Sequence, residues 1–172
     1  MDKKVGIVSC YFKHNYGSML QAYATQKILD DWNIPNETIN LKKLDAQIAK
    51  GKQKYYFSQL FNFSFIKAKL GMVKLKLYCK FANVELGKNI KMRDKKFEEF
   101  VQNFHLSKAF ETMEDICKEG QYSDVLVGSD QLWLPVNIVA DYYTLNFVPE
   151  NVNKISFATS FGVSQIPEKY KK

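Results

Sequence analysis

Short apolar strands and amphipathic helices alternate along this chain, and this alternation limits its fold more than any other feature. Val5–Cys10 is an apolar, β-branched run, and Glu37–Leu41 alternates in polarity as a second strand does. A segment with helical periodicity lies between them, and a strand, a helix and a strand in this order form a right-handed βαβ unit with parallel strands. The sequence therefore predicts an α/β fold. The apolar residues that recur at helical spacing in that segment are Leu20, Ala24, Ile28 and Trp32.

The same alternation continues toward the end of the chain. Arg93–Phe104 has apolar residues at spacings of three and four, which predicts an amphipathic helix. Thr112–Asp115 resembles a capping box that opens a short helix ending at Gly120. Asp124–Gly128 and Asn153–Phe157 are predicted to be two further strands.

The composition suits one globular domain with a hydrophobic core. The chain has 172 residues, of which 46% are hydrophobic and 25% charged, and a domain of this size buries roughly 70% of its unfolded surface, so it needs no disulfide or metal. Its three cysteines lie far apart and form no CxxC pair, which favours a reducing compartment. No stretch approaches the roughly 20 apolar residues of a membrane span, and the N-terminal run is too short for a signal peptide. We therefore expect a cytoplasmic protein.

Positive charge is concentrated in the middle of the chain. The segment 42–96 holds 15 basic and 3 acidic residues, whereas the whole chain has a net charge of only +7. Such a block can attract nucleic acid, anionic lipid headgroups or an anionic substrate, and it can equally be a solvated lysine-rich surface. Because the segment has neither an RNP-type aromatic pattern nor a clear helix-turn-helix, we expect no nucleic acid partner.

Within this basic segment, residues 66–82 have two apolar faces. One stripe is flanked by lysines, as in a helix lying on a membrane surface. The opposite face also holds apolar residues, which favours a helix packed within the protein. Both interpretations stay open. The stripe is Ile66, Leu70, Val73, Leu77 and Phe81, and the opposite face holds Met72, Leu75, Cys79 and Ala82.

Polar loops follow three of the predicted strands, and ligands of α/β sheets bind at the carboxyl ends of strands. His14–Ser18 places a glycine at the start of a helix, whose N-terminal N–H groups can hold an anion or a hydroxyl-rich group. Gly128–Trp133 joins a hydroxyl, a carboxylate and an amide to an indole, a mixture suited to binding a sugar. Thr159–Gly162 is a candidate for lining the same cleft. The structural alternative is that these residues only form turns, helix caps and core packing.

Other chemistries find less support in the sequence. The two histidines, His14 and His105, lie far apart and have no third ligand, so we expect no metal site. Cys10 ends the first strand, where a small buried side chain is a better interpretation than a nucleophile. Neither a P-loop nor a GxGxxG motif occurs, which argues against the commonest nucleotide sites.

Four segments of the chain resemble the polysaccharide pyruvyl transferase family, in order and at plausible distances. NYGSMLQAYA and VGSDQLW are the motifs specific to the family, whereas FEEF alone does not indicate a family. Where the family often has an asparagine after the tryptophan, this chain has Leu134 and Pro135. The four segments are NYGSMLQAYATQKIL (15–29), FEEF (97–100), YSDVLVGSDQLW (122–133) and KISFATSFG (154–162).

The resemblance implies both a fold and an activity. Members are expected to have a GT-B-like, glycosyltransferase-like fold of two Rossmann-like domains with the active site between them. Residues 1–172 would then be the N-terminal domain, three-layered with a mostly parallel sheet and a helical basic insertion at about 42–94, and the C-terminal domain would be absent from this chain. The implied reaction transfers pyruvate from phosphoenolpyruvate, a co-substrate rather than a bound cofactor, to a pair of sugar hydroxyls in exopolysaccharide biosynthesis.

The family motifs also imply a substrate site and an acceptor, and the charge of the basic segment suggests a location. Asp130 is the only carboxylate placed to help a sugar hydroxyl attack, and the acceptor would be a sugar or a lipid-linked oligosaccharide. The basic segment 42–96 would hold the protein peripherally at the inner face of the membrane. The chain alone is expected to be inactive, and the alternative is a non-catalytic sugar-binding or interaction module left by truncation. The residues expected to bind substrate are Asn15, Tyr16, Gly17, Ser18, Gln21, Ser129, Gln131 and Trp133.

Overall fold

A five-stranded parallel sheet forms the centre of the molecule, in a computed structural model that describes residues 3–81, 84–166 and 168. The strand order is β3-β2-β1-β4-β5, and every neighbouring pair is parallel. The central first strand with later strands on both sides is the Rossmann-like arrangement. This confirms the predicted α/β fold. The strands are β1 (Lys4–Val8), β2 (Asn36–Asn40), β3 (Leu106–Ala109), β4 (Tyr122–Asp130) and β5 (Asn153–Thr159).

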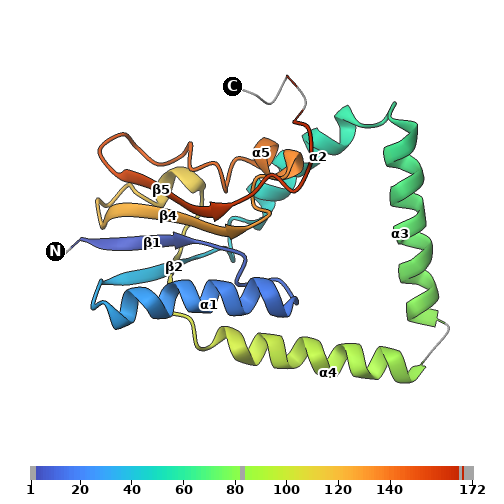
Figure 1. Ribbon diagram of the computed structural model, residues 1–172, viewed down its shortest axis with the longest axis horizontal. Helices are drawn as coiled ribbons and strands as arrows, with labels where there is room; N and C mark the ends of the chain where they lie inside the picture. The colour runs from blue at the N-terminus through green and yellow to red at the C-terminus, as the bar shows by residue number, and fades with distance from the viewer. Residues whose placement is uncertain (1–2, 82–83, 167, 169–172) are drawn as a thin grey trace.

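Helices lie on both sides of this sheet. α1 (Tyr16–Asp31) and α4 (Val84–Val101) lie on one side, and the 3-10 helix η1 (Met113–Asp115) and α5 (Pro135–Ala140) lie on the other (Figure 1). This distribution is what right-handed crossovers between parallel strands require. It places the carboxyl ends of the strands, the start of α1 and the start of α5 at one edge of the molecule.

The sequence prediction located four strands and missed β3. The helix predicted to extend to Phe104 ends at Val101, and β3 begins only five residues later. β3 has four residues and pairs with β2 alone, so it is too short for an alternating pattern to show. Its central Ser107 is buried, and the Ser107 hydroxyl accepts the Asn40 N–H at 3.0 Å.

The helix predicted between the first two strands is confirmed as α1, but its apolar stripe does not face the core. Leu20, Ile28 and Trp32 are 56%, 48% and 68% exposed. The buried face instead contains a glutamine, because the Gln26 side chain accepts the His105 N–H at 2.8 Å and donates to the Asn103 carbonyl at 3.3 Å. A polar residue satisfied in this way interrupts the apolar pattern that a sequence shows. The buried residues of α1 are Met19, Ala22, Gln26 and Leu29.

Three successive helices connect β2 to β3, which confirms that the basic segment is helical. They are α2 (Asp45–Ser58), α3 (Phe63–Phe81) and α4. α2 packs against α5 at the carboxyl edge, α3 stands beyond that edge, and α4 returns beneath α1 (Figure 1). On α3 the predicted apolar stripe is largely exposed: Leu70 is 64%, Val73 53% and Leu77 51% exposed. The stripe is therefore not packed within the described part of the chain; Ala82 and the side chains of Cys79 and Phe81 lie outside the described residues.

Candidate functional site

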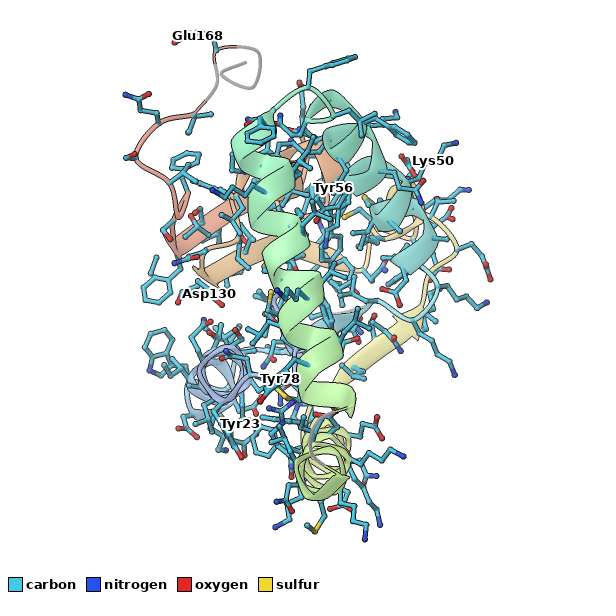
Figure 2. The ribbon with its side chains drawn as sticks, turned by 90° about the vertical axis from the view of Figure 1, so that its right-hand side faces the viewer. Tyr23, Lys50, Tyr56, Tyr78, Asp130 and Glu168 are labelled. Carbon is cyan, nitrogen blue, oxygen red and sulfur yellow. The ribbon has the colours of Figure 1, made fainter. Side chains whose placement is uncertain are left out.

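A pocket of about 690 Å³ opens at the carboxyl edge of the sheet. Its walls come from the loop after β1, the first turns of α1, the end of β4, α2 and the start of α5. In Figure 2, which looks onto this edge, Asp130 lies between β4 and the end-on α1, and α3 crosses in front. The pocket brings together most of the residues that the sequence predicted. These are Asn15, Gly17, Ser18, Gln21, Ser129, Asp130 and Gln131.

The loop after β1 presents Ser18 to the pocket through the cap of α1. Asn15 is the N-cap residue, and its side-chain oxygen accepts the Ser18 N–H at 3.1 Å. A Cβ at Gly17 would lie 3.3 Å from that oxygen, so a larger residue would crowd the cap. With its own N–H satisfied, Ser18 donates its hydroxyl to the Asp130 carboxylate at 2.7 Å. The cap of α1 is therefore Asn15, and Ser18 lines the pocket.

Asp130 is fixed from several sides at the end of β4. One carboxylate oxygen accepts the Ser18 hydroxyl, and the other accepts the Gln131 N–H at 2.7 Å. Its carbonyl accepts the N–H groups of Leu132 at 2.8 Å and Ser160 at 3.0 Å. Its φ of 107° lies in a region that non-glycine residues rarely adopt. These contacts hold the carboxylate in one position at the pocket wall, with lone pairs left for a ligand.

Gln21 connects α1 to the residue before Asp130. With its amide group oriented to match its neighbours, Gln21 donates to the Ser129 carbonyl at 3.0 Å and accepts the Ser129 hydroxyl at 3.1 Å and the Ser129 N–H. Gly128, one residue earlier, permits β4 to lie close to β5, because a Cβ there would overlap the Phe157 carbonyl oxygen. The end of β4 is thus held by α1 on one side and by β5 on the other.

Two predicted residues lie outside the pocket. Tyr16 is 67% exposed, and its ring packs on Phe97 of α4 at a centroid distance of 4.8 Å. Trp133 is half-buried and packs on Phe161 at 5.4 Å. Its indole N–H donates to the Tyr143 carbonyl at 2.9 Å. Trp133 therefore supports the neighbouring loops, whereas Tyr16 packs between α1 and α4.

The third predicted loop supports the second without lining the pocket. The Ser160 carbonyl accepts the backbone N–H of Trp133 at 3.1 Å, and the backbone N–H of Ser160 donates to the Asp130 carbonyl at 3.0 Å. Gly162 has a φ of 61°, and a Cβ there would lie 2.9 Å from the Gln131 side chain. Thr159–Gly162 therefore positions the loop that carries the site.

The structure adds pocket residues that the sequence prediction missed. Lys13 lies in the loop between β1 and α1, Lys52 and Tyr56 come from α2, and Tyr143 follows α5. The place of Lys13 after a strand was a usable signal, since strand ends carry ligand sites. Lys52 could not be distinguished from the other lysines of the basic segment, because its orientation depends on the packing of α2 against α5.

Cys10 lies at the base of the pocket as a buried thiol. It is 8% exposed, and its sulfur lies 3.1 Å from the Tyr143 hydroxyl. Burial raises the pKa of Cys10 above its usual range, and burial also raises the pKa of Tyr143. A buried thiol with a raised pKa is a poor nucleophile at neutral pH. The described residues contain no group of three His, Cys, Asp or Glu side chains that could hold a metal ion.

Comparison with known proteins gives one match. The family model described as Polysaccharide pyruvyl transferase matches residues 15–172, which includes every predicted site residue. No curated protein and no solved structure matches the chain. None of the helices in the described part of the chain combines the length and apolar character that crossing a bilayer requires.

Proposed function

The chain belongs to the polysaccharide pyruvyl transferase family, and we propose that its carboxyl-edge pocket holds the sugar acceptor of a pyruvyl transfer. One observation carries the proposal: the 2.7 Å hydrogen bond from Ser18 to Asp130. It joins the two specific motifs, 112 residues apart in sequence, into one polar wall. A wall of carboxylate, hydroxyl and amide groups suits the hydroxyls of a sugar.

The proposed reaction needs a base at the acceptor hydroxyl. A general acid gives a proton to the methylene carbon of phosphoenolpyruvate, which becomes a methyl group, and the enol carbon forms a bond to the sugar oxygen. The proton of this first hydroxyl passes to the base. The second hydroxyl then displaces phosphate to close the ketal, and its proton leaves with the phosphate. Asp130 is the proposed base, because its carboxylate is positioned in the pocket by Ser18 and by the Gln131 N–H. Gln131 and Asn15 orient the acceptor.

We further propose that this domain supplies the acceptor-side half of a two-domain, GT-B-like active site. In this proposal the chain alone binds the acceptor without turning it over. A non-catalytic sugar-binding or interaction module is the alternative. A sugar-binding module would also bind sugar in the pocket, an interaction module would not, and only the first interpretation requires Asp130 for pyruvyl transfer.

Sugar binding is tested by an NMR titration of the ¹⁵N-labelled chain with methyl glycosides of galactose, glucose and mannose. The expected result is a shift of the amide signals of Ser18, Ser129 and Gln131 by at least one of these sugars. Gln131→Ala should weaken binding, whereas Gln53→Ala, an exposed residue of α2 outside the pocket lining, should not. Shifts confined to other parts of the chain, or no shift with any sugar, would contradict the proposal.

Exposed apolar residues and lysines on α3 favour a second role, which we propose as peripheral binding to an anionic membrane surface. Phe61 and Phe63 before and at the start of α3 are 101% and 78% exposed. The sequence of α3 contains no acidic residue, so its lysines complement anionic lipid headgroups. Such a surface would bring the pocket close to a lipid-linked acceptor.

Vesicle co-sedimentation tests this second role. The chain should pellet with phosphatidylglycerol-containing vesicles at low salt and be released at high salt, because ionic strength screens the attraction. Replacing Lys67, Lys69 and Lys74 by Gln should abolish pelleting, whereas replacing Lys27, Lys108 and Lys118 by Gln should not. Equal pelleting of both triple variants, or none by the unaltered chain, would refute membrane binding through α3.

A further inference from the structure

Two lysines share the pocket with Asp130, although none of the family motifs contains them. Lys13 comes from the loop after β1 and Lys52 from the middle of α2, and both line the cavity. They are 39 residues apart in the sequence and line one pocket because the loop after β1 and α2 reach the same sheet edge.

Neither ammonium group has a carboxylate partner within ion-pair distance among the described residues, whose ion pairs involve other lysines. Lys13 is exposed, and its ammonium lies 5.2 Å from the Phe12 ring centre. Lys52 is half-buried. Burial lowers the pKa of Lys52 below its usual range, and the charge of Lys13 lowers it further.

A pair of unpaired like charges in a pocket is unfavourable for the free protein. Burying a cation costs free energy unless a partner compensates it. Asp45 and Cys10 act on Lys52 in the opposite direction, but more weakly than burial and Lys13 do. The missing counter-charge is therefore one that a ligand can supply, and a multiply charged anion could contact both ammonium groups.

From this geometry we propose that Lys13 and Lys52 form a phosphate-binding subsite of the pocket. The proposal rests on the proposed function for the identity of the phosphate compound, but the subsite itself does not require turnover. Two compounds of the proposed reaction carry the required chemistry. One is phosphoenolpyruvate, and the other is an acceptor sugar attached through phosphate to a lipid or other carrier.

The position of α2 supports a binding role for Lys52. A Cβ at Gly51 would lie 2.6 Å from the Ala140 Cα, so α2 crosses α5 at close range beside Lys52. Lys50 and Lys54 on the same helix are exposed and do not line the pocket. Lys50 extends to the outer side of the molecule in Figure 2, away from Asp130. These neighbours provide matched controls for charge and helix position.

Calorimetric titration of the chain with inorganic phosphate tests the subsite directly. Lys52→Gln and Lys13→Gln should each weaken phosphate binding by about tenfold, the scale of one lost charge-assisted hydrogen bond. Lys50→Gln should leave the affinity unchanged, and Lys52→Arg should retain most of it. Circular dichroism of each variant checks that the fold is intact.

Two further titrations identify the phosphate source. Phosphoenolpyruvate is compared with galactose 1-phosphate, using free galactose as the uncharged control, and the compound whose binding depends on Lys52 is the one this subsite receives. The proposal is overturned if the unaltered chain binds none of the three phosphate compounds, or if Lys50→Gln weakens binding as much as Lys52→Gln. That failure would leave sugar binding by Ser18, Gln131 and Asp130 untouched, so the two proposals fail separately.

Discussion

Asp130 has a backbone conformation that few non-glycine residues adopt, at the point where the pocket needs a carboxylate. Its φ of 107° costs about 1–3 kcal/mol for a residue with a Cβ. The hydrogen bonds to its side chain and its carbonyl hold it there. Strain of this kind persists where the surrounding structure determines it, and it often accompanies a binding or catalytic role.

This strain predicts that glycine at position 130 gives a larger free energy of unfolding than alanine does. Asp130→Ala and Asp130→Gly both lose the hydrogen bond from Ser18, but only glycine relieves the strain. Urea denaturation should therefore find Asp130→Ala less stable than Asp130→Gly, by about 1–2 kcal/mol. Asp124, earlier on the same strand and without a positive φ, serves as the control. There the order should reverse, because glycine weakens an ordinary strand; the same order at both positions would contradict strain at Asp130.

At the scale of elements, the contact between α2 and α5 determines where Lys52 lies. Gly51 faces the backbone of Ala140. A Cβ added to Gly51 would lie only 2.6 Å from the Ala140 Cα. A substitution at Gly51 must therefore move one helix relative to the other. The close packing at Gly51 therefore determines whether Lys52 lines the pocket.

Gly51→Ala should consequently destabilise the chain and lower its affinity for inorganic phosphate. Overpacking of this kind costs about 1–3 kcal/mol, and the displaced α2 takes Lys52 away from Lys13. Gly71→Ala on α3 is the matched control, because no atom lies within 4 Å of its added Cβ. That variant should be more stable by roughly 0.5–1 kcal/mol, since alanine favours a helix. Unchanged stability and phosphate affinity in Gly51→Ala would show that the helices are not in close contact.

For the whole molecule, the alternation of strands and helices was enough to predict the parallel sheet. Most of the residues predicted from the motifs after β1 and β4 line the pocket, because carboxyl ends of parallel strands meet at one edge. The sequence did not predict side-chain positions that depend on tertiary contacts. Gln26 satisfies its amide in the core, Trp133 packs behind its loop, and Lys52 enters the pocket through helix packing.

The central claim is that the Asp130 carboxylate activates the acceptor hydroxyl, and the most direct test is pyruvyl transfer by an enzyme with both halves of the proposed active site. Asp130→Asn keeps the size and shape of the side chain and removes the base. We predict that phosphate release from phosphoenolpyruvate in the presence of acceptor falls by about 100-fold or more. Thermal unfolding should change little, and Asp124→Asn should retain activity. Turnover by Asp130→Asn equal to that of the unaltered enzyme would contradict the claim.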